Sequence, residues 1–184
     1  MSSLEKLYLK NKKYYQRRLS IILDRLHIEN EQILDLGCGE MLLKDFLPTE
    51  RNGNYLGVDN IAYQNISDFI CMDVLQFLKV NHNHYDFIFC LGLLDHLELE
   101  VQNEFLDLIS LRQHSKIILS KSNEKNIFFR FLNVGRGVEF EHQFLILKKI
   151  YLLKIPKTSL VIHLTFIGSI FATEVIYFLA SKRN

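Results

Sequence analysis

The sequence predicts an α/β fold, a mostly parallel sheet with helices on both of its faces. Short apolar segments of strand length alternate along the chain with segments of helical spacing, which is typical of parallel strands joined by helices. One apolar segment runs directly into a Gly-x-Gly turn, and acidic residues stand at the ends of the next two strand segments. The carboxyl ends of parallel strands share one edge of a sheet, and ligands bind there.

The expected elements follow one another as a helix, then alternating strands and helices, then a terminal strand pair. The apolar spacing predicts helices over residues 4–27, 40–47, 74–80, 98–111 and 143–153. Pro48 ends the second of these helices. Strands are expected over residues 32–36, 55–59, 68–71, 85–91 and 116–120. Residues 123–142 are expected to be irregular.

The segment 159–180 is long and apolar enough to raise the question of a membrane span. Its residues from Leu160 to Phe166 alternate between two faces, and Glu174 interrupts the apolar run. A period of two indicates a strand, so we interpret the segment as two strands joined near residues 168–169 and expect no membrane span.

Length and composition fit one domain, with residues 1–30 as a helical cap and residues 31–184 as the α/β core. Apolar residues make up 48% of the 184 and can bury a sizeable core. The formal net charge of +1 favours neither nucleic acid nor a membrane surface as partner. A basic run in residues 1–18 and an acidic run in residues 95–107 are interpreted as solvated helix faces.

Three cysteines, Cys38, Cys71 and Cys90, share no spacing typical of metal ligands. No signal peptide is visible at the charged N-terminus. We therefore expect free thiols, no bound metal and a cytoplasmic location.

The strongest motif is "ILDLGCGE" at residues 33–40, an apolar strand followed by a glycine turn. Gly37 and Gly39 permit a tight turn and a close approach of a ligand to the backbone. A dinucleotide site would need a third glycine three residues after Gly39, where the chain has Leu42. Asp35 and Glu40 flank the turn, which favours a cationic ligand over a phosphate. An ordinary strand-to-helix turn is the alternative.

Two further acids follow the second and third strand segments. Asp59 stands 20 residues after Gly39, where a carboxylate can accept hydrogen bonds from both hydroxyls of a ribose. Asp73 can accept a hydrogen bond from the exocyclic amine of adenine, and the Val74 backbone amide can donate one to a ring nitrogen. The alternatives are a turn residue for Asp59 and a helix N-cap for Asp73.

Taken together, these segments resemble the class I S-adenosylmethionine (SAM)-dependent methyltransferase superfamily, especially its small-molecule members. "ILDLGCGE" is similar to motif I, "YLGVD" to the ribose-binding strand end, "FICMDV" to the adenine segment and "YDFIFCLGLLDHL" to the motif IV strand and loop. "KIILS" resembles the fifth strand, and the final strand pair resembles the family's hairpin. The resemblance extends over nearly the whole chain from Gln32. It implies a Rossmann-like, seven-stranded, mostly parallel sheet with an antiparallel last strand.

The resemblance implies SAM as the cofactor and assigns its contacts by position. The contacts would come from Asp35, Gly37 and Gly39 around the methionine part, Asp59 at the ribose, Asp73 and Val74 at the adenine, and the Leu91 backbone near the amine. Cys38 and Asn60 are further expected cofactor contacts. Where the family often has a third glycine, this chain has Met41. The chain also lacks the Asn/Asp-Pro-Pro-Tyr loop of enzymes that methylate amino groups of bases and of glutamine.

The implied activity is methyl transfer to an oxygen or nitrogen of a small molecule, a glycan or a lipid intermediate. His96 and His142 are the candidate general bases. The candidate acceptor-binding residues are Tyr14, Tyr15, Arg18, Arg130 and Arg136. Two alternatives remain open: a SAM-binding subunit or sensor that needs a partner, and an RNA methyltransferase suggested only by the basic first helix. The sequence predicts no oligomeric state.

Overall fold

The computed structural model describes residues 16, 18–20, 22–47, 54–61, 67–112, 115–122, 164–165 and 174–180. Five parallel strands form the centre of the fold in the order β3-β2-β1-β4-β5. They are β1 (Ile33–Leu36), β2 (Tyr55–Asp59), β3 (Phe69–Cys71), β4 (Phe87–Leu91) and β5 (Lys116–Ser122). The predicted α/β fold with a parallel sheet is confirmed.

At the β5 edge, β7 (Glu174–Ala180) pairs antiparallel with β5, and the short β6 (Leu164–Thr165) pairs antiparallel with β7. The register joins Lys116 to Ala180 and Ser122 to Glu174. β5 is two residues longer than the strand predicted over residues 116–120, because these two residues also pair with β7. The predicted join near residues 168–169 lies outside the described residues.

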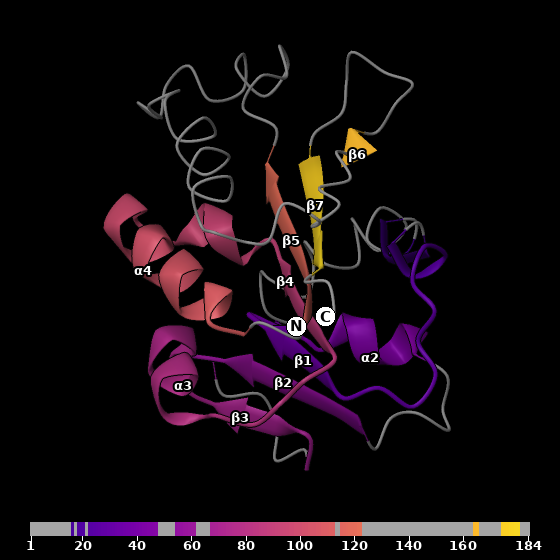
Figure 1. Ribbon diagram of the computed structural model, residues 1–184, viewed down its shortest axis with the longest axis horizontal. Helices are drawn as coiled ribbons and strands as arrows, with labels where there is room; N and C mark the ends of the chain where they lie inside the picture. Colours follow the sequence, from indigo (N-terminus) through magenta and orange to yellow (C-terminus); the bar gives the residue numbers. More distant parts are fainter. Residues whose placement is uncertain are drawn as a thin grey trace, which may run out of the picture.

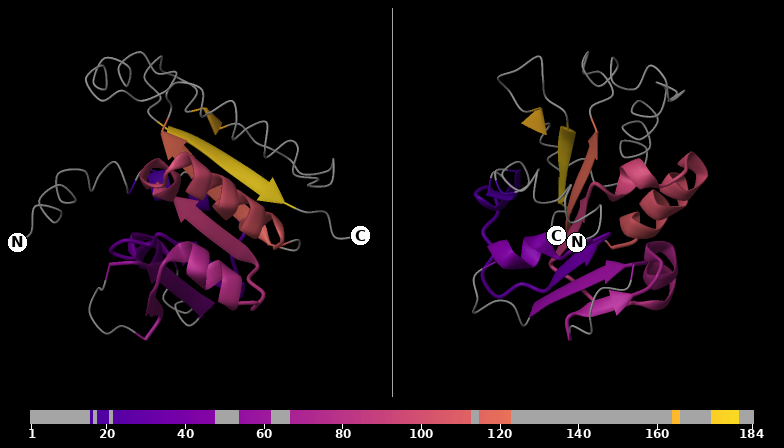
Figure 2. Two further views of the ribbon diagram at one scale, coloured as in Figure 1. Left: turned by 90° about the vertical axis from the view of Figure 1, so that its left-hand side faces the viewer. Right: turned by 180° about the vertical axis from the view of Figure 1, so that it is seen from behind.

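Helices cover both faces of the sheet, as Figures 1 and 2 show from three directions. On one face lie α3 (Val74–Val80) and α4 (Leu99–Ser110), and on the other lies α2 (Leu42–Phe46). The helical residues 16, 18–20 and 22–23 pack on the same side as α2, since Leu19 and Ile22 share a buried cluster with Leu43.

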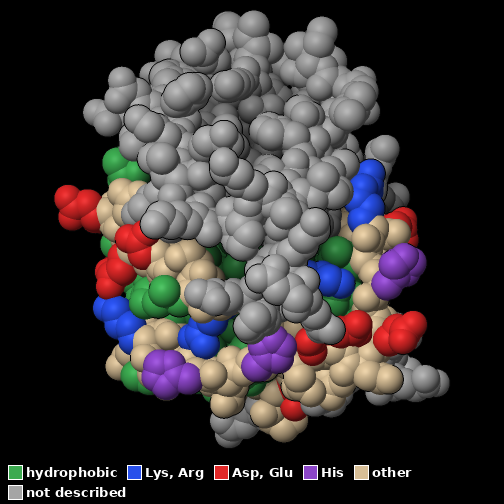
Figure 3. All heavy atoms as spheres, in the orientation of Figure 1, with side chains coloured by type: hydrophobic (Ala, Val, Ile, Leu, Met, Phe, Trp, Pro, Cys, Tyr) green, Lys and Arg blue, Asp and Glu red, His purple; other side chains and the backbone are tan. Residues whose placement is uncertain are grey.

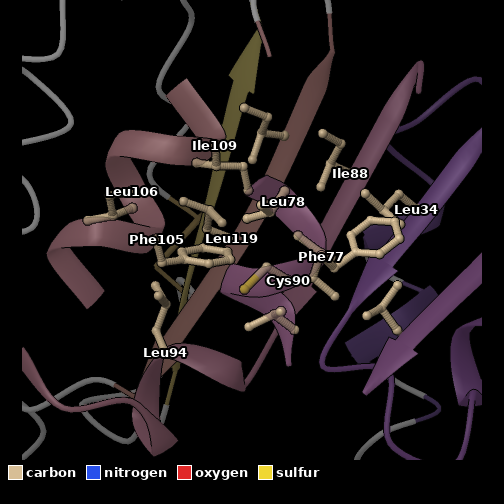
Figure 4. Packing of buried hydrophobic residues seen from close by; sticks show 14 of the residues in the cluster. Leu34, Phe77, Leu78, Ile88, Cys90, Leu94, Phe105, Leu106, Ile109 and Leu119 are labelled. Carbon is tan, nitrogen blue, oxygen red and sulfur yellow. The ribbon is translucent and has the colours of Figure 1, made fainter. Parts of the chain in front are cut away.

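The alternation of side chains along each strand produces two cores. In β1, Leu34 and Leu36 belong to the cluster beneath α3 and α4, whereas Ile33 belongs to the cluster on the opposite face. Figure 4 shows the first cluster, in which Phe77 of α3 and Phe105 of α4 reach toward the sheet. Both phenylalanines are almost completely buried.

Two helices differ from their predicted bounds by two or more residues at one end. The first helix ends at Leu23 and not at His27, because Arg25 N and Leu26 N bond three residues back, to Ile22 O and Leu23 O. Such tightened bonds close the last turn of a helix. The second helix begins at Leu42 and not at Glu40, since Met41, the residue before it, has left-handed backbone angles.

The remaining predicted helices are recovered where the structure describes them. α3 has the predicted bounds, and α4 is one residue shorter at each end. The irregular segment 123–142 and the helix over residues 143–153 lie outside the described residues. Among those described, no helix has the length and apolar character needed to cross a bilayer.

The acidic run predicted as a solvated helix face is exposed. Its members Asp95, Glu98, Glu100, Glu104 and Asp107 are all exposed, on α4 and the turn before it. Figure 3 shows acidic side chains on the side of the molecule where α4 lies in Figure 1.

Candidate functional site

The glycine turn lies at the carboxyl edge of the sheet, between the ends of β1 and β2. The amides of Gly37 and Cys38 both donate to Val58 O, at 2.8 and 3.2 Å. Gly37 and Gly39 have φ values of 70° and 52°, a region that glycine enters without the strain of a Cβ. The turn therefore needs glycine at both predicted positions.

The carboxylate of Asp59 joins the glycine turn to the end of β2. Its Oδ2 accepts a hydrogen bond from Gly39 N at 3.0 Å, and its Oδ1 accepts one from Ile61 N at 3.1 Å. Met72 N donates to Asp59 O at 2.9 Å and so connects the end of β3 to the same point. Each carboxylate oxygen has a second lone pair, which can accept a hydrogen bond from a ligand hydroxyl.

The two turn glycines have different surroundings. A Cβ added at Gly39 would meet no heavy atom within 4 Å. A Cβ at Gly37 would lie 3.0 Å from the Leu93 side chain, which follows β4. Gly37 thus makes room for protein packing, whereas the space beside Gly39 can receive a ligand.

Asp35 is a buried carboxyl on the sheet face that the N-terminal helical segment covers. It is 4% exposed, and Oδ2 accepts a hydrogen bond from the Tyr55 hydroxyl at 2.8 Å. Burial raises the pKa of Asp35 to about 7, although the Tyr55 hydrogen bond and the positive charge of Arg18 both lower it. The same burial strongly raises the pKa of the Tyr55 hydroxyl, so Tyr55 is the donor.

Gly57 accommodates the groups that surround this carboxyl. A Cβ on Gly57 would lie 2.8 Å from Cys38 Sγ and 3.3 Å from the Tyr55 hydroxyl oxygen. The Cys38 side chain is buried and, with its pKa raised by burial, remains a thiol. Cys38 therefore faces the sheet with its side chain, and its predicted cofactor contact would have to come from its backbone.

Asp73 is the N-cap of α3. Its Oδ1 accepts hydrogen bonds from Leu75 N and Gln76 N, both at 3.0 Å. The side chain is exposed, and Oδ2 is not engaged by these two bonds. Capping and adenine binding are therefore compatible, while the buried Val74 side chain anchors the start of the helix.

Arg18 lies at the same edge as the glycine turn. Its Nη2 donates to Ser120 Oγ at 2.6 Å, and that oxygen also accepts from Gly92 N at 2.8 Å. Ser120 pairs in register with Leu91, the predicted backbone contact at the end of β4. Arg18 is 6% exposed, so it presents little of its side chain to an acceptor.

The other predicted positions separate into two groups. His96 is exposed at the end of a 3-10 helix, η2 (Leu93–His96), and Asn60 is exposed beside Asp59. Tyr14, Tyr15, Arg130, Arg136 and His142 lie outside the described residues. Among the described residues, no group of three His, Cys, Asp or Glu side chains could hold a metal ion.

Sequence reasoning missed Tyr55, Ser120 and Gly92. Ser120 and Gly92 were detectable as a hydroxyl and a glycine at the ends of two strands. Tyr55 carried no such signal, because it stands at the start of β2 and its ring reaches across Gly57.

Solved SAM-dependent methyltransferases share the fold of this chain. A solved SAM-dependent methyltransferase from Archaeoglobus fulgidus is similar over 96% of this chain and 100% of its own, with a TM-score of 0.68 and 15% identity. The methyltransferase domain of bacterial CtHen1 matches over 90% and 98%, with a TM-score of 0.64 and 18% identity. Magnesium protoporphyrin IX methyltransferase (ChlM) from Synechocystis PCC 6803, solved with bound S-adenosylhomocysteine (SAH), matches over 98% and 89%, with a TM-score of 0.62 and 16% identity. No family model and no curated protein matches the sequence.

Proposed function

We propose that the protein is a SAM-dependent methyltransferase, and the observation that carries the proposal is the hydrogen bond between Gly39 N and Asp59 Oδ2. The bond brings the Asp59 carboxylate, which could accept hydrogen bonds from a ribose, beside a glycine that leaves open space next to the backbone. The fold shared with solved SAM-dependent methyltransferases supports the same assignment. The expected single domain and seven-stranded sheet with an antiparallel last strand belong to this proposal, and the pairings of β6 and β7 support them.

The residues at the edge fit SAM better than a dinucleotide. SAM carries a sulfonium and an ammonium and no phosphate, and the carboxyl of Asp35 lies next to the turn. A dinucleotide would place a pyrophosphate at the N-terminus of the helix after the turn. That helix, α2, has five residues, and Leu42 stands where the dinucleotide motif has its third glycine. The acids Asp35 and Glu40 would also repel a pyrophosphate.

The three aspartates among the predicted cofactor residues have distinct tasks in this proposal. Asp59 would accept hydrogen bonds from the two ribose hydroxyls, and Asp73 Oδ2 would accept one from the adenine amine. Asp35, in its ionised form, would attract the ammonium. SAM supplies a methyl group already activated by the sulfonium, so the protein mainly has to align the acceptor in line with the methyl–sulfur bond.

The acceptor side of the site is proposed from the sequence. A protonated oxygen or nitrogen acceptor needs a base, for which His96 and His142 are the candidates. Acceptor contacts are proposed from Tyr14, Tyr15, Arg130 and Arg136, with a small molecule, a glycan or a lipid-linked intermediate as the acceptor; the buried Arg18 is not among them. The alternative, a SAM-binding subunit that acts with a partner, has the same cofactor site and differs only in needing a second protein for turnover.

Isothermal titration of the full chain with SAM, SAH and NAD tests the proposal. We expect saturable binding of SAM and SAH and none of NAD. Preference for NAD, or no binding of either SAM or SAH, would overturn it. A screen of acceptors then distinguishes the two alternatives, since an enzyme that works alone will release SAH without a partner.

A further inference from the structure

Arg18 connects the N-terminal helical segment to two strand ends at the candidate site. The neighbouring Leu19 and Ile22 are buried in the core cluster on this face, so the segment is anchored by apolar packing. A buried guanidinium requires partners for its donors. Here Nη2 donates to Ser120 Oγ, which also accepts the hydrogen bond of Gly92 N. One hydroxyl oxygen thus joins Arg18 to the turn after β4.

This turn determines where η2 lies against the glycine turn. Gly92 has a φ of 87° and immediately precedes η2 (Leu93–His96). A Cβ built on Gly37 would be 3.0 Å from Leu93 Cβ and Cδ1, so η2 is packed closely against the turn. A shift of Gly92 would therefore move η2 relative to Gly37.

Arg18 also acts on Asp35 through its charge. Its positive charge lowers the pKa of Asp35, against the dominant effect of burial. The charged and titratable groups that interact with Asp35 come from every element around it: Arg18 of the N-terminal segment, Tyr55 and Asp59 of β2, Cys38 of the glycine turn and Cys90 of β4. Arg18 is the cation in this set.

We propose that Arg18 is a positioning residue of the cofactor site: through Ser120 it holds the Gly92 turn, and with it η2, against the glycine turn. This inference rests on the proposed function, because it takes the site beside the glycine turn to bind SAM. It gives Arg18 a different role from contact with the acceptor, in agreement with its burial and with its bond to Ser120.

Three variants of the full chain separate the two effects. Arg18→Gln removes the charge but keeps a group that can donate to Ser120. Arg18→Lys keeps the charge but replaces the planar guanidinium, with its several N–H donors, by an ammonium group. Ser120→Ala removes the connection to Gly92 and leaves the charge in place. SAH affinity is measured for each by titration calorimetry between pH 5.5 and 8.5, and the Asp35 carboxyl is titrated by NMR without ligand.

In the parent, SAH affinity should rise with pH until Asp35 is ionised. In Arg18→Gln, the Asp35 midpoint should move upward by about one pH unit, and the rise in affinity should move with it. In Ser120→Ala, SAH affinity should fall about tenfold at every pH, while the Asp35 midpoint stays where it is in the parent. Arg18→Lys should keep the parent midpoint and also lose affinity. A role in stability alone would not produce this separation.

Undiminished SAH affinity in Ser120→Ala would overturn the proposal, and so would undiminished SAH affinity in Arg18→Lys. If Arg18→Gln does not fold, Ser120→Ala and Arg18→Lys still test the proposal. Unchanged SAH affinity in both variants would show that Arg18 does not position the Gly92 turn. A parent that binds neither SAM nor SAH would refute the proposed function, whereas the ligand-free titration of Asp35 would still test the effect of Arg18.

Discussion

Asp59 Oδ2 accepts a hydrogen bond from the backbone amide of Gly39 at 3.0 Å, although 20 residues separate them in the chain. The contact joins the end of β2 to the turn after β1, the two places where the sequence predicts cofactor contacts. A ligand beside Gly39 would therefore meet the Asp59 carboxylate, and the site can be tested through this pair.

Asp59→Ala should weaken SAH binding by about 2–3 kcal/mol, because in the proposed site it removes a charged acceptor for two ribose hydroxyls. The variant should remain folded, since the side chain is only partly buried. Titration calorimetry gives the affinity and circular dichroism checks the fold. Asp107→Ala, an exposed position on α4, is the matched control and should bind as the parent does. Equal affinity in Asp59→Ala and the control would show that Asp59 does not hold the ribose.

The buried carboxyl of Asp35 should make stability depend on pH. Its pKa is raised from 3.8 to about 7 in the folded chain, first of all by burial. The folded protein therefore keeps a proton that the unfolded chain loses above pH 4, and the stability contributed by this proton is lost as pH rises toward 7. Between pH 5 and pH 8 the loss from this group should be about 3 kcal/mol.

Asp35→Asn isolates this contribution, because the Asn side-chain oxygen can still accept from the Tyr55 hydroxyl but does not titrate. Urea unfolding at pH 5 and pH 8 gives the free energy of unfolding of both proteins. The parent should lose more stability than the variant between these two pH values. The same change in both would contradict a neutral Asp35 in the folded protein.

Met41 occupies a backbone conformation suited to glycine. Its φ and ψ are 58° and 34°, and its side chain is 5% exposed in the core cluster around Leu19. Met41→Ala and Met41→Gly should both be destabilised, by about 2–4 kcal/mol, because each leaves a cavity. The glycine variant should be the more stable of the two by about 1 kcal/mol, since only alanine has a Cβ that opposes a positive φ. Thermal unfolding of the pair measures the difference, and a more stable alanine variant would exclude left-handed backbone at Met41.

Gly57→Ala should destabilise the fold by about 1–3 kcal/mol, because the new Cβ would lie 2.8 Å from Cys38 Sγ. Cys38→Ala removes that sulfur and should recover part of the loss when combined with Gly57→Ala. A double-mutant cycle from urea unfolding measures the coupling between the two positions. Additive losses would mean that Gly57 and Cys38 do not compete for the same space.

The sequence by itself determined the order of strands and helices and the positions of Gly37, Gly39 and Asp59. Local patterns specify these features: apolar alternation marks a strand, a glycine pair marks a turn with positive φ, and an acid at a strand end lies at the ligand edge of a parallel sheet. The resemblance added SAM as the expected ligand, and the contact between Gly39 and Asp59 agrees with it.

Only the tertiary structure decided how the buried polar groups pair. Arg18 meets Ser120 across 102 positions of sequence, and Tyr55 meets Asp35 across the space left by Gly57. Such pairs depend on which strands become neighbours and on which face of the sheet each side chain lies. The local spacing of apolar residues does not predict which distant side chains will meet. The left-handed backbone of Met41 was hidden for the same reason, because burial of its side chain in the core stabilises a conformation that its residue type does not favour.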